Sequence, residues 1–131
     1  MYLLDTNTCI FLMKNRAEVV SHYMRVATSG VAISSITLSE LQFGVYNSMF
    51  PEKNGENLLR FLLGVAVLDF SSKAAEEYGK IRAYLRRKGT PIGELDMLIA
   101  AHAKSDNLIL VTNNAAEFNR IEGLDIEDWT L

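Results

Sequence analysis

The sequence contains one cysteine, two prolines and two histidines in 131 residues. A single cysteine excludes an internal disulfide, and the place of Cys9 in an apolar helical run favours packing over reactivity. The longest uncharged apolar run, 61–68, is far shorter than the ~18 residues that indicate a membrane span, so no membrane segment is predicted. The N-terminus lacks the basic and apolar regions of a signal peptide, and we therefore expect a cytoplasmic protein.

Positive charge is also scarce, because 13 Lys and Arg stand against 16 Asp and Glu, for a net charge of −3. This balance excludes a protein that coats nucleic acid through a general positive field, so any nucleic-acid contact must be local. Hydrophobic residues make up 49% of the chain and charged residues 22%, as in an average globular protein. Since no repeat or linker is visible, we expect a single domain over residues 1–131.

Short, mostly continuous apolar runs predict strands that are buried on both faces, at 2–4, 31–34, 65–69 and 108–111. Helical segments separate them, at about 7–13, 17–28, 38–48, 56–63, 72–88 and 94–105. The alternation predicts an α/β domain with three α/β/α layers and a central parallel sheet of four to five short strands. In such sheets, sites form where loops leave the carboxyl ends of the strands.

Two acidic residues near that edge are candidates for a site, and each also has a structural explanation. Asp5 follows the first strand and would cap the helix that comes next. Glu40 closes the sequence Thr37-Leu38-Ser39-Glu40, which reads as a capping box in which Thr37 and Glu40 satisfy free helix N–H groups. Neither residue decides between the two interpretations alone.

Asp96 is placed differently, because it belongs to a helix with clear periodicity. At about 100° per residue it falls inside the apolar arc, surrounded by Leu95, Ile99, Ala100 and Ala103. A carboxylate that faces the core is costly unless its charge is compensated, which favours a functional role. Glu94, on the polar side, is explained by the helix dipole.

Acids that converge from distant points of the chain repel one another, so such a cluster takes up protons or holds a cation. Oxygen ligands without a matching set of His or Cys favour Mg²⁺ or Mn²⁺ over zinc. His22 and His102 lack metal-ligand spacing, and we interpret both as structural. A hard ion of this kind keeps positions open for water and phosphate oxygens, which points to phosphodiester chemistry.

Four further polar residues are candidates for supporting roles at this edge. Asn114 offers an amide oxygen as a fourth ligand position, with Glu117 close behind, but it is equally a cap for a short helix over 115–118. Thr6 and Thr112 would position a water or a carboxylate through their hydroxyls, although turn chemistry also explains them.

The basic stretch 80–88 ends at Gly89 and supports two interpretations. Cations in a last turn before glycine are ordinary helix termination. Alternatively, Arg82, Arg86 and Arg87 grip RNA phosphates. Only their direction relative to the acids separates these possibilities.

Four motifs in order resemble those of a PIN domain of the VapC type, the toxin half of bacterial VapBC toxin–antitoxin modules. They are Leu4-Asp5-Thr6-Asn7, Ser35-Ile36-Thr37-Leu38-Ser39-Glu40-Leu41, Pro91-Ile92-Gly93-Glu94-Leu95-Asp96 with the following Ile99-Ala100-Ala101-His102-Ala103, and Val111-Thr112-Asn113-Asn114 with Glu117-Phe118. The match runs from Asp5 to Trp129.

The resemblance implies a Mg²⁺- or Mn²⁺-dependent endoribonuclease that cleaves RNA by water attack on its backbone. Asp5, Glu40 and Asp96 match the acidic metal ligands of the family. Asn114 matches a fourth position that is acidic in many members, so this chain has one negative charge fewer for a second ion.

The resemblance also implies a homodimer and a cognate VapB antitoxin whose C-terminal segment occupies the active-site groove, with DNA contacted only through that complex. Pro91-Ile92-Gly93 and residues 123–129 look most like the enterobacterial branch, which cleaves initiator tRNA in its anticodon loop and so inhibits translation. A groove shaped for one folded RNA is consistent with the acidic overall balance.

Two other functions remain open at this point. A catalytically silent PIN-fold module would act through its dimer and antitoxin contacts alone, but the presence of all three acids argues against it. A Mg²⁺-dependent phosphotransfer receiver would need an acidic pair near Asp5 and a lysine after a late strand. The chain instead has Thr6-Asn7 and Thr112-Asn113 at those places.

Overall fold

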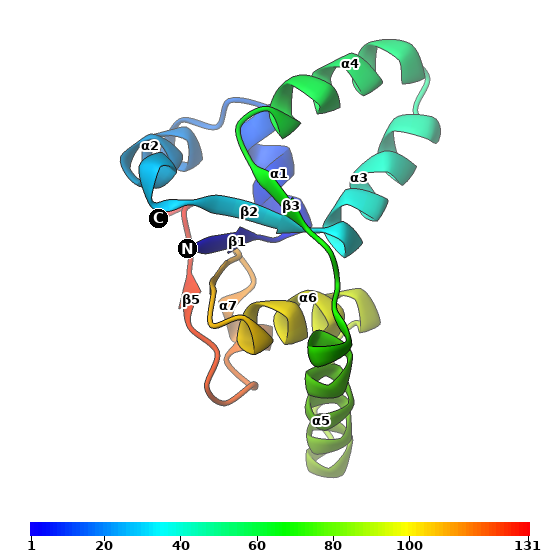
Figure 1. The fold of residues 1–131 in the computed structure, drawn as a ribbon, viewed down its shortest axis with the longest axis vertical. Coiled ribbons are helices and arrows are strands. Elements are labelled where there is room, and N and C mark those ends of the chain that lie inside the picture. Colours follow the sequence, from blue (N-terminus) through cyan, green and yellow to red (C-terminus); the bar gives the residue numbers. More distant parts are fainter.

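The computed structural model describes residues 1–131 and contains one five-stranded sheet in the order β3-β2-β1-β4-β5, with every neighbouring pair parallel. The strands are β1 (Tyr2–Leu4), β2 (Val31–Ser34), β3 (Ala66–Leu68), β4 (Ile109–Val111) and β5 (Ile126–Glu127). Helices lie on both faces of the sheet (Figure 1), so the predicted three-layer α/β fold is confirmed.

The helices are α1 (Thr6–Met13), α2 (Ala17–Val26), α3 (Ser35–Tyr46), α4 (Pro51–Leu62), α5 (Ser72–Lys88), α6 (Glu94–Ser105) and α7 (Ala115–Phe118). A 3₁₀ turn, Ala27–Ser29, extends α2. The arrangement places α1 to α4 on one side of the sheet and α5 to α7 on the other (Figure 1). None of these helices combines the length and the apolar character that crossing a membrane requires.

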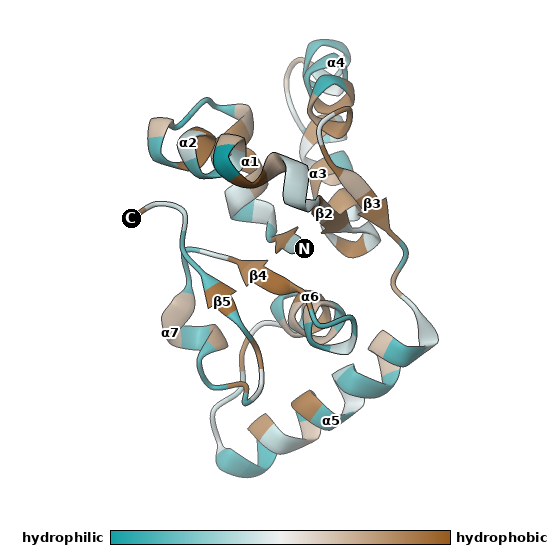
Figure 2. Cartoon of the chain, turned by 60° about the vertical axis from the view of Figure 1, so that its left-hand side comes forward, coloured by the Kyte–Doolittle hydropathy of each residue, from teal (hydrophilic) through white to brown (hydrophobic).

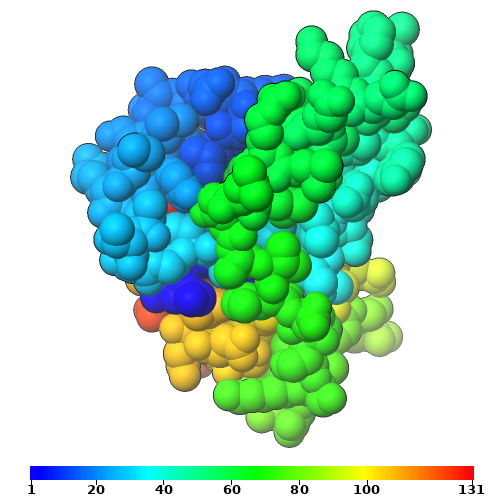
Figure 3. Space-filling model, turned by 45° about the horizontal axis from the view of Figure 1, so that its top comes forward, coloured from blue at the N-terminus to red at the C-terminus, as the bar shows by residue number.

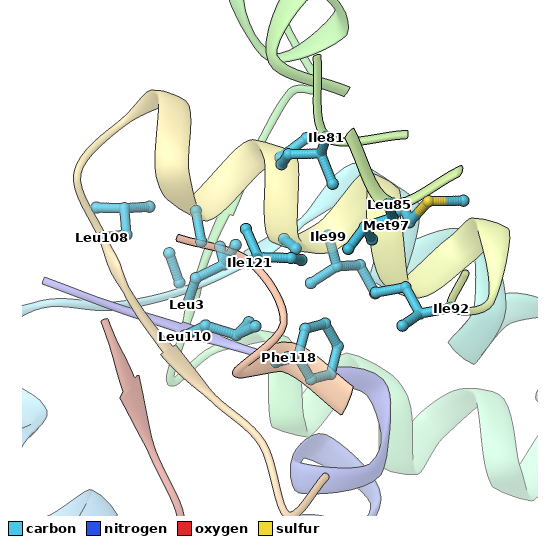
Figure 4. Close-up of a cluster of buried hydrophobic side chains, with 14 residues drawn as sticks. Leu3, Ile81, Leu85, Ile92, Met97, Ile99, Leu108, Leu110, Phe118 and Ile121 are labelled. Carbon is cyan, nitrogen blue, oxygen red and sulfur yellow. The ribbon is translucent and has the colours of Figure 1, made fainter. Parts of the chain in front are cut away.

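Two apolar cores hold the helices to the sheet, one on each face. Successive strand residues point to opposite faces, so neighbours such as Leu3 and Leu4 enter different cores. The first core joins β1 and β4 to α5, α6 and α7 through residues including Leu3, Leu110 and Phe118 (Figure 4). The second joins Leu4 and its neighbours to α1 to α4 and to Trp129, the only tryptophan. The sheet edge between the cores is thereby fixed from both sides.

Several expected boundaries are wrong, and the cause is local. α3 begins at Ser35 rather than near residue 38, because the Ser34 hydroxyl accepts a hydrogen bond from the Ile36 N–H at 3.1 Å and caps the helix there. α4 begins at Pro51, whose missing N–H suits a first helical position. The capping box is therefore absent, since Thr37 lies within the helix rather than at its cap.

The outer strands also differ from expectation. β3 is an edge strand whose side chains are partly exposed, with Val67 at 40%, so it is not buried on both faces. β5 was not among the strands located from the sequence. Figure 2 shows apolar strands at the centre of the molecule and a mostly hydrophilic α5 at its periphery. The α3–α4 hairpin stands out from the body (Figure 3) and exposes large apolar side chains, namely Phe43, Tyr46, Met49, Phe50, Leu59 and Leu63.

Candidate active site

Asp5 lies where β1 ends and is only 5% exposed. It is the N-cap of α1, since its Oδ1 accepts a hydrogen bond from the Thr8 N–H at 2.8 Å. Burial raises the pKa of Asp5 above its usual value, although hydrogen bonds from Thr112 and Thr8 oppose the rise. The expected capping role of Asp5 is thus confirmed. The cap uses only Oδ1 of its two carboxylate oxygens.

Glu40 is held toward the same edge by α3 and is half-buried. The Thr6 hydroxyl donates a hydrogen bond of 2.6 Å to Glu40 Oε1, and this contact joins α1 to α3 across 34 residues of sequence. Glu40 therefore points to the start of α1 rather than back to the N-terminus of its own helix, as a capping box would require.

Asp96 lies in the first turn of α6 and is half-buried, not deep in the core. The apolar arc is narrower than predicted, because Leu95 beside it is 47% exposed. The pKa of Asp96 is raised, first by burial and then by the negative charges of Glu117, Asp5 and Glu40. Glu117 of α7, Asp5 at the cap of α1 and Glu40 of α3 therefore lie near enough to Asp96 for their charges to act on it.

Glu117 is the fourth acid of this group, and the Asn114 side chain donates a hydrogen bond to it. Asn114 begins α7 but makes no side-chain cap; its Nδ2 donates instead to Glu117 Oε2 at 2.7 Å. Its backbone N–H donates to Thr112 Oγ1 at 3.0 Å, which ties the loop to the buried end of β4. The carboxylate of Glu117, which the sequence already placed close behind Asn114, is thereby held by the Asn114 amide.

The four acidic side chains are near enough for their charges to repel one another, but they are not drawn together as a complete set of metal ligands. No group of three or more His, Cys, Asp or Glu side chains is drawn together closely enough to hold a metal ion without further movement. The donors are nevertheless all oxygens, and the like charges that raise the pKa of Asp96 are those that a divalent cation would relieve. The residues therefore fit a hard cation such as Mg²⁺.

Sequence reasoning missed Asp128, which follows β5 at the same edge. Its negative charge contributes to the raised pKa of Asp5, after the larger effect of burial. Asp128 Oδ1 accepts hydrogen bonds from both the backbone N–H and the hydroxyl of Thr130, at 2.8 and 2.6 Å. Recognising residues 126–127 as a strand would have brought Asp128 into the set by the rule that located Asp5.

The three candidate arginines do not lie together. Arg82 and Arg86 line a surface pocket with Pro91, Glu94 and Met97, beside the first turn of α6. Arg82 also pairs with Glu94, at 3.5 Å between Nη2 and Oε1. Arg87 lines a separate pocket with Lys80 and Lys104. Two of the three therefore lie beside Glu94 and Met97 of α6, in a pocket that Asp96 does not line, and the third lies elsewhere.

Known proteins resemble this chain over nearly its whole length. The model of the PIN domain family matches residues 2–124. A protein of Salmonella typhimurium named tRNA(fMet)-specific endonuclease VapC is 49% identical over 128 residues, covering 98% of this chain and 97% of the relative. A Shigella flexneri protein of the same name is 44% identical over 129 residues, covering 98% of each.

Solved structures agree with these relatives. The structure of VapBC2 from Rickettsia felis bound to a DNA fragment from their promoter matches with a TM-score of 0.93 at 42% identity, covering 98% of both chains. DNA-bound VapBC from Salmonella typhimurium matches with a TM-score of 0.92 at 48% identity, covering 98% of this chain and 97% of that one. PIN-domain ribonucleases generally depend on divalent metal ions, in keeping with the oxygen donors described above. The chain therefore belongs to the PIN domain family and, within it, to the VapC ribonucleases.

Proposed function

We propose that this protein is the toxin of a type II toxin–antitoxin pair and acts as a Mg²⁺- or Mn²⁺-dependent endoribonuclease in the cytoplasm. The observation that carries the proposal is that the fold brings Asp5, Glu40, Asp96 and Glu117 from separate elements to one edge of the sheet, close enough for their charges to act on Asp96. The fold gathers like charges at the carboxyl edge of a parallel sheet, where ligands bind. Such an arrangement is costly without a cation, and family membership supplies the chemistry that the cation serves.

Asp5, Glu40 and Asp96 hold the metal, and Glu117 joins them as the fourth acid. A bound ion would supply activation of a water for attack and stabilisation of charge on the leaving oxygen of the RNA backbone. The chain's own polar groups orient the carboxylates, since Thr6 donates to Glu40 and Asn114 to Glu117.

Donors and acceptors at the end of β4 complete the support of the site. The buried Thr112 side chain lowers the pKa of Asp5 against the effect of burial, and its hydroxyl accepts from the Asn114 N–H at 3.0 Å, so it acts on two arms of the site. We assign Thr6, Thr112 and Asn114 to orientation of the acids, because each acid that they contact is then held in one direction.

The proposed substrate is initiator tRNA, cleaved in its anticodon loop, which would stop translation. Relatives that are 44% and 49% identical over nearly the full chain carry the name tRNA(fMet)-specific endonuclease. We assign the RNA phosphate contact to Arg82 and Arg86, which line one surface pocket beside Glu94 and Met97 in the first turn of α6. Arg87 lies in a different pocket, and we leave it out of the RNA contact.

We also propose a homodimer that binds a VapB-type antitoxin and reaches operator DNA only through that complex. Structures of related VapBC pairs bound to DNA support this assembly. A surface pocket that includes Thr6 and Glu40 continues over apolar side chains of Ile10, Met13 and Leu58. An antitoxin segment with apolar side chains would fill this pocket and block the acids.

The test is to induce the protein in a bacterium and map new RNA 5′ ends, with Asp96→Asn as the inactive variant. The matched control is Asp125→Asn, since Asp125 is exposed and precedes β5, at the opposite end of the strands. We expect a dominant new end in the anticodon loop of initiator tRNA for the wild type and for Asp125→Asn. No cleavage by the wild type would favour the silent binding module, and cleavage by Asp96→Asn would refute the assigned site.

A further inference from the structure

The proposed mechanism leaves one pair of buried polar side chains without a role. His102 on α6 and Ser34 at the end of β2 are both completely buried. His102 Nδ1 lies 2.8 Å from Ser34 Oγ, across 68 residues of sequence. No other side-chain hydrogen bond links α6 to α3 or to the cap of α3. Burying two polar groups is costly unless they satisfy each other, so this contact needs a reason.

The surroundings of His102 assign its protons. Burial lowers the pKa of His102, although Asp106 opposes the fall, so the ring is neutral at pH 7. Its Nε2 lies 3.5 Å from Asp106 Oδ2 and makes no hydrogen bond. A carboxylate can only accept a hydrogen bond, which favours a proton on Nε2 and makes Nδ1 an acceptor.

With that tautomer the Ser34 hydroxyl has a single consistent arrangement. Its hydrogen is donated to His102 Nδ1, and its oxygen accepts from the Ile36 N–H at 3.1 Å. The imidazole also packs nearly perpendicular to the ring of Phe70, with centroids 5.7 Å apart and an interplanar angle of 88°. Ser34 is thereby held in the direction that the N-cap of α3 requires.

The order Asp106, His102, Ser34 matches that of a hydrolase triad, but the burial of Ser34 excludes this use. A nucleophilic hydroxyl must reach a substrate carbonyl, whereas Ser34 and His102 each have an exposed fraction of 0%. The contact therefore acts within the protein, between two helices.

Those two helices carry two of the acids of the site. Ser34 caps α3, which bears Glu40, and His102 lies on α6, which bears Asp96. We propose that His102 is a positioning residue: by binding Ser34 it fixes α3 against α6 and so sets Glu40 opposite Asp96 for a shared metal ion. Apolar packing alone is non-directional, and a directional hydrogen bond selects one register between the helices. The role rests on the metal site proposed above.

The experiment compares binding of Mn²⁺, without RNA, to the wild type and to variants of the pair. His102→Leu removes both ring nitrogens, and Ser34→Ala removes only the hydroxyl. His102→Asn keeps an acceptor near the position of Nδ1. Substitutions behind metal ligands weaken metal binding by about 10- to 100-fold, so we expect at least a tenfold loss in His102→Leu and Ser34→Ala. We expect His102→Asn to retain most of the affinity.

The control for lost stability is Leu108→Ala, because Leu108 belongs to the core around α6 and directly precedes β4, at the end of the sheet away from the acids. Binding is measured by isothermal titration well below the melting temperature of every variant. Mn²⁺ affinities of His102→Leu and Ser34→Ala equal to that of Leu108→Ala would overturn the positioning role. Ser34→Ala alone decides the matter if His102→Leu does not fold. A wild type that binds no Mn²⁺ would overturn the metal site itself and the positioning role with it.

Discussion

Phe118 offers a test of how a helix of one turn carries a functional acid. α7 spans only Ala115–Phe118, too short to be stable alone, and Glu117 is part of it. The Phe118 ring is 1% exposed and packs into the core beneath α6, among Leu3, Leu110 and Ile121 (Figure 4). The ring therefore anchors the segment that presents Glu117 to Asp96.

Phe118→Ala should cost about 3–5 kcal/mol, the range for removing a buried phenyl ring from a packed core. For a chain of 131 residues the total stability is about 7–20 kcal/mol, so the variant remains folded at 25 °C. At about 4 °C per kcal/mol, its melting temperature should fall by about 12–20 °C. Mn²⁺ binding should weaken beyond that of Leu108→Ala, because Glu117 loses its support while Leu108 does not carry a ligand.

Urea unfolding followed by the fluorescence of Trp129, which is buried and unique, measures the stability loss. Isothermal titration of the folded variants measures Mn²⁺ binding. A loss below about 1 kcal/mol, no larger than an ordinary point substitution, would show that the ring does not anchor α7. Equal Mn²⁺ affinity for Phe118→Ala and Leu108→Ala would show that Glu117 is not part of the site.

Three other expectations concern charge. The pKa values of Asp5 and Asp96 are raised in the folded state, mainly by burial, so the folded protein binds more protons than the unfolded chain between pH 3.8 and those raised values. In EDTA, the free energy of unfolding should therefore rise as the pH falls through that window. Urea unfolding should show a smaller rise for Asp96→Asn. The same dependence of the unfolding free energy on pH in Asp96→Asn and the wild type would contradict a raised pKa of Asp96. Asp96→Asn should raise the melting temperature in EDTA and abolish the rise that Mn²⁺ gives the wild type, whereas a retained Mn²⁺ response in thermal melts would exclude Asp96 as a ligand. Alanine at both Arg82 and Arg86 should weaken tRNA binding and reduce its dependence on salt. Arg87→Ala should do neither, in a filter-binding assay at matched ionic strength. A larger effect of Arg87→Ala would place the RNA on the pocket that Arg87 lines with Lys80 and Lys104.

Much of the fold could be predicted because the central strands and long helices have strong patterns. The helices over 72–88 and 94–105 match the structure at both ends, as their apolar periodicity and terminal residues indicate. β5 is not predicted from the sequence, because a strand of two residues, Ile126 and Glu127, is too short to show periodicity. The apolar run over 65–69 predicts a buried strand, but β3 is an edge strand with partly exposed side chains. An apolar run does not reveal whether its strand lies at the centre or at the edge of a sheet.

The site was predictable in its elements but not in its contacts. Counting polar residues after strand ends found Asp5 and Thr112, since the carboxyl ends of parallel strands share one edge. Side-chain direction is a tertiary property, so the sequence could not tell that Glu40 turns to Thr6 rather than to its own helix end. For the same reason the sequence could not tell that the Asn114 Nδ2 donates to Glu117, and the use of its amide oxygen as a fourth ligand stays a prediction.

The hydrogen bonds of the four acids indicate which of them depends most on a cation. Asp5 accepts from Thr8, Glu40 from Thr6 and Glu117 from Asn114, so each has a donor that offsets part of its charge. Asp96 accepts no hydrogen bond from the chain and faces the charges of the other three. An ionised carboxylate that is partly removed from water and has no donor is held at a cost, because nothing replaces its lost hydration. A divalent ion would offset that cost most at Asp96. Cation binding should therefore stabilise the folded protein chiefly through this residue.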